Sequence, residues 1–162
     1  MNDNRTSRVL TWTDPAEVVA GIAELDGIDA MRALRDGELP APPIAHTMNF
    51  TPVEVDHGRV VFTCIPGAEH YNPLGVVHGG LACTLLDTVA GCAAHTTLKA
   101  GQRYTSIEIT VKYLRPITLD TGPLTATGVV TKAGSRVIFA DAEIRDRSAK
   151  VVATGSSSLL VW

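Results

Sequence analysis

One segment, from about Gly80 to Leu98, constrains the fold more than any other part of the chain. Its large apolar residues, Leu81, Leu85, Leu86 and Val89, recur at helical spacing, and alanines occupy many of the positions between them. The predicted helix is therefore apolar around most of its circumference, which is typical of a helix that is buried on all sides. Such a helix requires other secondary structure that surrounds it.

The rest of the chain predicts a sheet that can surround this helix. Residues 48–56 and 59–65 are rich in β-formers and are joined by His57-Gly58, a hairpin-type turn. After Gly101 the spacing of the apolar residues changes from helical to alternating, which indicates strands. These strands are predicted at about 107–113, 122–131, 136–145 and 150–161. Short turns between successive strands favour an antiparallel meander. We therefore expect an α+β fold in which one antiparallel sheet of five or six strands wraps around one long central helix.

Residues 1–40 predict a helical arm with a Pro-rich connector rather than a separate domain. Asp14-Pro15 is typical of a helix start, a second short helix is predicted at about 29–35, and Gly37 is suited to end it. The expected organisation is this arm followed by one domain at 41–162. The sequence suggests no role for the arm beyond packing against a neighbouring subunit.

Net charge, the N-terminal residues and the cysteines limit the kinds of partner, location and site that the chain is expected to have. The chain has 162 residues and a formal net charge of −3, which gives no electrostatic reason to expect nucleic acid or an anionic membrane as a partner. The N-terminal residues contain no apolar run long enough for a signal peptide or a membrane anchor, so we expect a cytoplasmic protein. Three cysteines, Cys64, Cys83 and Cys92, are an odd number without a close pair, and we interpret them as small buried residues.

Two glycines stand where the long helix is predicted to begin. Gly79 and Gly80 allow a ligand to approach the backbone closely. The free N–H groups and the positive dipole end of a helix start favour an anion or a developing oxyanion. Glycines before a helix also occur for steric reasons alone, so this feature by itself leaves both interpretations open.

Asp87 is the unusual residue of the helix. It lies about two turns in, within an apolar run, and its helical neighbours are small. An ionised carboxylate in such a place is costly without partners, and aspartate is a mediocre helix former. Two interpretations remain open: a structural group bonded to a neighbouring strand or subunit, or a functional carboxylate in a partly dry pocket.

The run N-x(5)-H-G-G-x(6)-D resembles the signature of the PaaI-like (phenylacetic-acid-type) hotdog acyl-CoA thioesterases. The residues concerned are Asn72, His78, Gly79, Gly80 and Asp87. The similarity extends over about residues 40–162 and leaves the arm outside. The resemblance implies the hotdog fold, with subunits paired so that their sheets are continuous, as a homodimer or as a homotetramer made of two dimers. It also implies that the active sites lie at the dimer interface.

The resemblance implies four catalytic residues. Gly79 would donate its backbone N–H to the thioester carbonyl oxygen, as an oxyanion hole. Asn72 would bind or orient the attacking water or the carbonyl. Asp87 would come from the partner subunit as general base or nucleophile. Ser106 would hold the water, with Thr105 as the alternative.

Further residues are expected to contact the substrate around this centre. The substrate-binding candidates are His78, Gly80, Lys132 and Arg136. The resemblance implies that the turn that contains Lys132 and Arg136 lies near the nucleotide end of CoA, as it often does in this family, and Arg115 is a further candidate for the CoA phosphates. Each of the three is equally well interpreted as an ordinary solvated charge. His78 is expected to hold the loop or the neighbouring subunit by hydrogen bonds.

Two other kinds of active site are disfavoured. A Ser–His–Asp triad is not favoured because the chain has no G-x-S-x-G elbow. On one helix, moreover, His78 and Asp87 would lie about 13 Å apart. No H-E-x-x-H motif or Cys/His ligand cluster is present, so we expect neither a metal nor a cofactor.

The expected activity is hydrolysis of an acyl-CoA, with an aromatic or medium-chain acyl group, to the free acid and CoA. Whether Asp87 activates a water or attacks the thioester itself stays open. The alternative from another class is a non-catalytic acyl-CoA-binding or regulatory hotdog module, which would not need Asp87. A hotdog hydratase or dehydratase is a further alternative, but the chain lacks the usual motifs of those enzymes.

Overall fold

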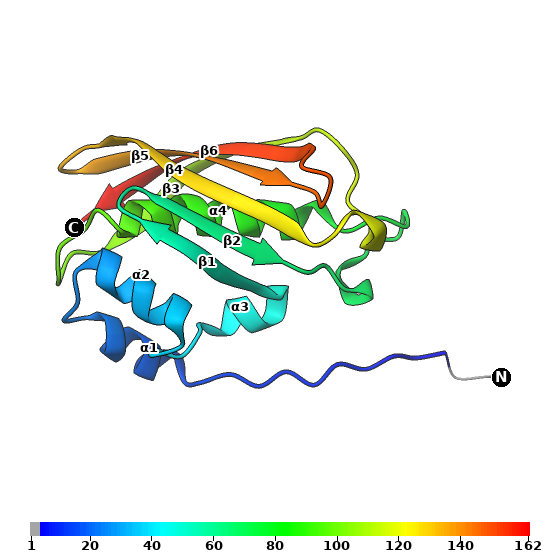
Figure 1. The fold of residues 1–162 in the computed structure, drawn as a ribbon, viewed down its shortest axis with the longest axis horizontal. Coiled ribbons are helices and arrows are strands. Elements are labelled where there is room, and N and C mark those ends of the chain that lie inside the picture. Colours follow the sequence, from blue (N-terminus) through cyan, green and yellow to red (C-terminus); the bar gives the residue numbers. More distant parts are fainter. Residues whose placement is uncertain (1–3) are drawn as a thin grey trace.

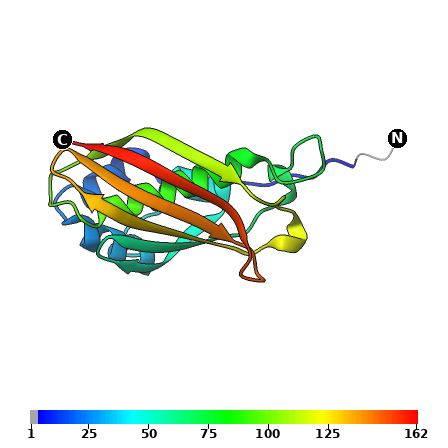
Figure 2. The same ribbon diagram turned by 90° about the horizontal axis from the view of Figure 1, so that it is seen from above.

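The computed structural model describes residues 4–162 and confirms the α+β architecture (Figure 1). Six strands form one antiparallel sheet in the order β1-β2-β4-β5-β6-β3, and the sheet curves over the long helix α4 (Figures 1 and 2). The elements are α1 (Pro15–Ile22), α2 (Gly27–Asp36), α3 (Pro43–Met48), β1 (Phe50–Asp56), β2 (Arg59–Cys64), α4 (Gly79–His95), β3 (Tyr104–Tyr113), β4 (Leu124–Ala133), β5 (Val137–Arg145) and β6 (Val151–Val161), with short 3-10 turns at Ala68–His70 and Leu119–Thr121.

The predicted buried helix is α4, and it forms the centre of the core. Leu85, Leu86 and Val89 are fully buried against the sheet. One flank of the helix differs from the expectation of burial on all sides, because Thr84, Asp87, Thr88 and Cys92 form a half-buried stripe at helical spacing. No helix within residues 4–162 combines the length and the apolar character that crossing a bilayer would take.

The backbone of β4 approaches α4 unusually closely at Gly128. A Cβ at this position would lie 2.1 Å from the carbonyl oxygen of Val89 and 3.0 Å from the nitrogen of Ala90. Only glycine fits such a contact, since real Cβ atoms do not come this near to backbone atoms. This contact brings the middle of the sheet down onto the helix.

The sheet topology differs from a simple meander in the position of β3. The β1–β2 hairpin and the β4–β5–β6 meander are present as predicted, with Gly58 at φ 75° in the first turn. However, β4 pairs with β2, and β3 pairs with β6 at the edge of the sheet. The reason lies in burial: four of the six residues of β2 are buried, so β2 needs a neighbour on both sides, whereas no residue of β3 is fully buried.

The segment that precedes β1, residues 4–49, contains one helix more than predicted, and we refer to this whole segment as the arm from here on. Asp14 caps α1 through a 2.9 Å hydrogen bond from the Ala16 N–H, and Gly37 ends α2 in the left-handed conformation, as expected. The helix α3 was not predicted, because its prolines indicated an extended connector. Prolines fit the first turn of a helix, so α3 begins at Pro43 and β1 starts only at Phe50.

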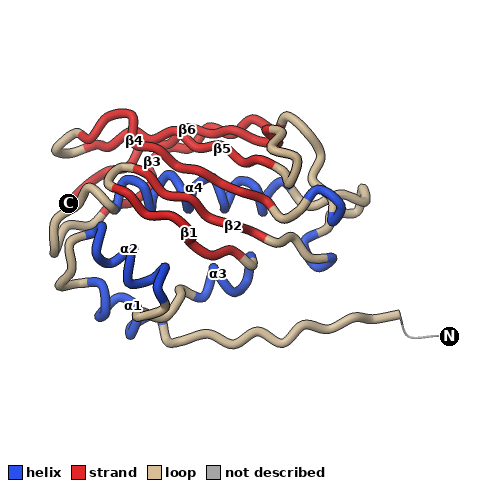
Figure 3. Tube along the Cα trace, in the orientation of Figure 1, coloured by secondary structure: helices blue, strands red, loops and turns tan. Residues whose placement is uncertain are grey.

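The arm packs on its own chain. The helix α2 contacts β1 and α4, and α3 contacts β1, so the three helices lie together beside that edge of the sheet (Figure 3). The Gly27 N–H donates to the Leu98 carbonyl at 3.0 Å, and Asp26 accepts from the Lys99 ammonium at 2.9 Å and from the Ala100 N–H at 3.0 Å. These bonds join the arm to the end of α4, whereas the sequence suggested only a neighbouring subunit.

We predict that Gly128→Ala destabilises the protein by about 1–3 kcal/mol, because the added methyl forces β4 away from α4. Urea unfolding monitored by circular dichroism measures this change. Gly21→Ala serves as the matched control, since its Cβ meets only the flexible end of Leu39 and alanine is favoured over glycine in a helix. Equal unfolding midpoints for Gly128→Ala and the wild type would show that the contact is not tight.

Candidate active site

Asp87 meets Ser106 on the flank of α4 that faces β3. The Ser106 hydroxyl donates to Oδ1 of Asp87 at 2.7 Å. Thr105, the alternative considered for this position, makes no such bond within residues 4–162. Successive side chains of a strand point to opposite faces, so only one of the two hydroxyls can reach the helix. The second oxygen of Asp87 has no partner among residues 4–162, which leaves it available as an acceptor.

The surroundings of Asp87 are largely dry. Burial, together with the negative charge of Asp87, raises the pKa of the Cys92 thiol to about 12. Burial also raises the pKa of Tyr104, and the nearby Cys92 and Asp87 add to this effect. Gly91 makes room for the Tyr104 ring, because a Cβ there would lie 2.6 Å from the phenol oxygen. The side of Asp87 that faces Cys92 and Tyr104 therefore borders buried groups, whereas Asp87 itself is half-buried.

The start of α4 presents a backbone donor. His78 caps the helix, since its Nδ1 accepts the Gly80 N–H at 2.8 Å. The Gly80 N–H is thereby occupied, whereas the Gly79 N–H has no acceptor among residues 4–162. Tyr113 fixes this turn from the end of β3, because its hydroxyl donates to the Gly79 carbonyl at 3.1 Å.

Asn72 lies in the loop beside this helix start. Its side-chain oxygen accepts from the Leu74 N–H at 2.9 Å and from the Val76 N–H at 3.4 Å, which holds the loop in shape. Its amide NH2 group is not used in these bonds and can donate elsewhere. Asn72, Gly79 and Arg115 line one hollow of about 320 Å³.

The residues of the motif therefore form two groups in one chain. Asp87 and Ser106 make the first group, and Asn72 and Gly79 make the second. Eight residues separate Gly79 from Asp87 on the same helix, which corresponds to about 12 Å along its axis. One small reacting group cannot contact both at once within a single chain.

The basic residues are divided in the same way. Lys132 and Arg136 lie in and beside the β4–β5 turn, at the end of the molecule opposite to the start of α4 (Figure 1). Arg115 instead shares the hollow of Gly79. Lys132 and Arg136 are exposed, so either side chain is accessible to a charged ligand.

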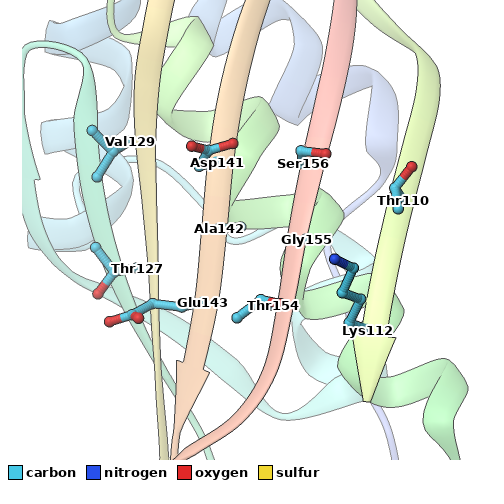
Figure 4. A pocket seen from close by; sticks show the side chains of 10 residues that line it. All are labelled: Thr110, Lys112, Thr127, Val129, Asp141, Ala142, Glu143, Thr154, Gly155 and Ser156. Carbon is cyan, nitrogen blue, oxygen red and sulfur yellow. The ribbon is translucent and has the colours of Figure 1, made fainter. Parts of the chain in front are cut away.

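Two further hollows differ sharply in character. The outer face of the sheet carries a polar hollow of about 520 Å³ with Lys112, Asp141 and Glu143 on it (Figure 4). It contains none of the motif residues. A mostly apolar cavity of about 330 Å³ lies on the other side of the sheet, between the arm and α4, and Asp87 lines it. Residues 4–162 contain no cluster of three or more His, Cys, Asp or Glu side chains suited to a metal ion.

Sequence reasoning missed two tyrosines that organise the site. Tyr113 holds the turn at Gly79, and Tyr104 packs on Gly91 beside Asp87. A signal was present, because both are large polar-tipped aromatics at the two ends of the strand that follows the helix. Aromatic residues are only 5% of the chain, so each of their positions is informative.

We predict that Cys64 and Cys92 react with iodoacetamide at pH 8 about 1000-fold more slowly in the native protein than in the unfolded chain. Burial raises the pKa of both thiols from 9.0 to about 12, which lowers the thiolate fraction by that factor. Peptide mapping by mass spectrometry after timed labelling, with and without urea, measures the two rates. Native labelling at the unfolded rate would contradict a dry environment beside Asp87.

Comparison with known proteins places the chain in a family. Residues 74–159 match the family described as the thioesterase superfamily. A protein of Caenorhabditis elegans, provisionally named an esterase, is 34% identical over 67% of this chain and 63% of its own length. A protein of Saccharolobus solfataricus with the same provisional name is 30% identical over 83% of this chain and 91% of its own. Human acyl-coenzyme A thioesterase 13 is 28% identical over 65% of this chain and 74% of its own.

A solved structure supports the same assignment. The PaaI protein from the phenylacetic acid degradation operon of E. coli superposes with a TM-score of 0.71 and 25% identity, over 84% of this chain and 94% of its own. The predicted hotdog fold, the PaaI-like resemblance and the class of thioester hydrolase are thereby confirmed. The chain therefore belongs to the thioesterase superfamily.

Proposed function

We propose that the protein hydrolyses acyl-CoA to a free acid and CoA, with Asp87 as its catalytic carboxylate. The observation that carries the proposal is the 2.7 Å bond from Ser106 to Asp87 at the edge of a mostly apolar cavity. A carboxylate with one oxygen fixed and one free, beside an apolar cavity, suits the activation of water next to a bound acyl group. The name of the human relative, an acyl-coenzyme A thioesterase, supports CoA as the thiol.

The complete site is formed by two copies of the chain, each of which supplies one group. The strand β3 is an edge strand, with Ile107 and Leu114 at or just beyond it more than half exposed. An exposed edge with apolar side chains favours pairing with another strand. The opposite edge, β1, is contacted by α2 and α3 of the same chain, so β3 is the edge suited to dimerisation.

The two groups lie at opposite ends of β3, which explains how pairing completes the site. Ser106, bonded to Asp87, is near the start of β3, and Tyr113, bonded to Gly79, is at its end. A two-fold axis pairs the two β3 strands in antiparallel fashion. The start of one strand then lies opposite the end of the other, and Asp87 of one copy approaches Gly79 of its partner.

The reaction then follows from the donors and acceptors of the two groups. The Gly79 N–H stabilises the negative charge that develops on the thioester oxygen, and Asn72 orients the carbonyl or the water through its free NH2. The second oxygen of Asp87 takes a proton from water as the water oxygen attacks the carbonyl carbon. The C–S bond then breaks, and the CoA thiolate takes up the proton. Direct attack by Asp87 would instead form a mixed anhydride, and solvent oxygen-18 in Asp87 after one turnover distinguishes the two routes.

Basic residues on both copies suit the phosphates of CoA. In the paired arrangement the β4–β5 turn of one copy, with Lys132 and Arg136, lies toward the end of the partner that carries Gly79 and Arg115. Phosphate groups favour arginine and lysine. His78 and Gly80 contribute to the site indirectly. The Gly80 N–H is bonded to Nδ1 of His78, so the Gly79 N–H is the donor at the helix start that a ligand can use.

The alternative of a non-catalytic acyl-CoA-binding module has less support. Such a module needs the fold and a basic path but not a hydroxyl fixed on a half-buried carboxylate. The homotetramer and the cytoplasmic location stay predictions. In a tetramer, two dimers could pack through the outer face of the sheet, on which Lys112 and Asp141 carry opposite charges (Figure 4). Light scattering of the native protein measures the mass of the assembly.

We predict that Asp87→Asn lowers kcat by about 100-fold or more with little change in KM, because the carboxylate acts mainly in the transition state. Release of free CoA thiol from a panel of acyl-CoAs measures both constants. Asp141→Asn on the outer face is the matched control and keeps wild-type values. A wild-type protein that binds acyl-CoA without hydrolysing it would favour the binding module instead.

We predict that two inactive variants restore activity when they are mixed. Gly79→Pro removes the N–H, and proline is tolerated at the first position of a helix. After joint refolding at equal amounts with Asp87→Asn, half of the dimers are mixed and each has one intact site of two, which gives about a quarter of wild-type activity in a symmetric dimer. Mixed activity no higher than that of the separate variants would mean that each chain forms its own site.

A further inference from the structure

About half of the lining of the apolar cavity beside Asp87 comes from the arm that precedes β1. Met31 and Leu34 come from α2, and Ala45 comes from α3. Phe50 and Phe62, from β1 and β2, contribute two aromatic side chains that pack edge to face. Asp87 lines the same cavity from α4. A group that enters from Asp87 would therefore contact the arm.

The charge of the cavity indicates what kind of group it accepts. Among residues 4–162, Arg35 is the one cationic side chain on its lining, and it is paired with Asp36 through hydrogen bonds of 2.8 and 2.9 Å. Arg35 thus already has a carboxylate partner, and the lining supplies no second cation for a further carboxylate on the acyl group. A neutral, apolar acyl group fits these surroundings, whereas the acyl part of a dicarboxylic acid does not.

The size of the cavity limits the acyl group further. Its volume of about 330 Å³ is about twice that of an engineered apolar cavity of about 150 Å³ that binds benzene. An arylacetyl or medium-chain acyl group is of this size, and a long chain would need an opening through the arm. The arm is held in place by the bonds of Gly27 and Asp26 to the end of α4.

We infer that the arm forms the wall of the acyl pocket and that Leu34 and Ala45 set the size of acyl group accepted. This inference rests on the proposed function. The arm lies outside residues 74–159, the part matched to the family.

Two substitutions of opposite effect test the inference. Leu34→Ala enlarges the cavity, and Ala45→Leu fills it. The test compares kcat/KM for decanoyl-CoA with kcat/KM for butanoyl-CoA. This ratio should rise about tenfold in Leu34→Ala and fall about tenfold in Ala45→Leu. Leu39→Ala removes the same atoms from the arm outside the cavity lining and should keep the wild-type ratio. Circular dichroism and the thermal midpoint verify that each variant is folded.

Direct binding separates this inference from the proposed function. Calorimetric titration with phenylacetate and octanoate requires no catalysis, and Ala45→Leu should weaken binding of both about tenfold relative to wild type and Leu39→Ala. Unchanged acyl ratios in folded variants that still hydrolyse acyl-CoA would overturn the pocket and leave the thioesterase proposal intact. Weakened acid binding without any thioester hydrolysis would support the pocket and overturn the thioesterase proposal. Equal binding in all variants would overturn the pocket.

Discussion

The close approach of α4 to the sheet is the constraint on which the rest of the structure depends. At Gly128 the strand β4 lies so near the helix that no side chain fits between the two backbones. The core around it is built from aliphatic residues and alanines, which pack at short range. Because the centre of the helix is closed in this way, the hollows beside it lie toward its ends and along one flank, and those that contain motif residues are at Gly79 and at Asp87.

Asp87 is compatible with this core because of its position on the helix. The half-buried stripe of Thr84, Asp87, Thr88 and Cys92 turns away from the sheet interior and toward β3 and the arm. A carboxylate at the position of Leu86 would be buried against the sheet without a donor, at a large cost. At its actual position it receives the hydroxyl of Ser106, and one of its oxygens remains open. The site thus uses a gap in the packing that the fold itself leaves.

Local sequence patterns predicted the elements well, whereas their neighbours in space were harder to predict. The buried helix, the hairpin at Gly58 and the helix end at Gly37 depend on residues close in sequence. The place of β3 at the edge depends on the burial of β2, which lies some fifty residues earlier. The cavity beside Asp87 combines residues of six elements (α2, α3, β1, β2, α4 and β3), so no single segment signals it. The motif spacing identified Asp87 and Gly79, but the bonds of Tyr104 and Tyr113 follow only from the fold.

The two edges of the sheet differ, and this difference connects assembly with specificity. The edge at β1 is contacted by the chain's own arm, which closes a cavity against Asp87. The edge at β3 stays open and carries Ser106 and Tyr113, the hydrogen-bond partners of Asp87 and Gly79. If the arm covered β3 instead, the chain would lose the edge that pairing requires and Asp87 would lose its apolar cavity. In the arrangement that we propose, the open edge assembles the reaction centre between two copies, and the covered edge places the acyl pocket on the opposite side of Asp87.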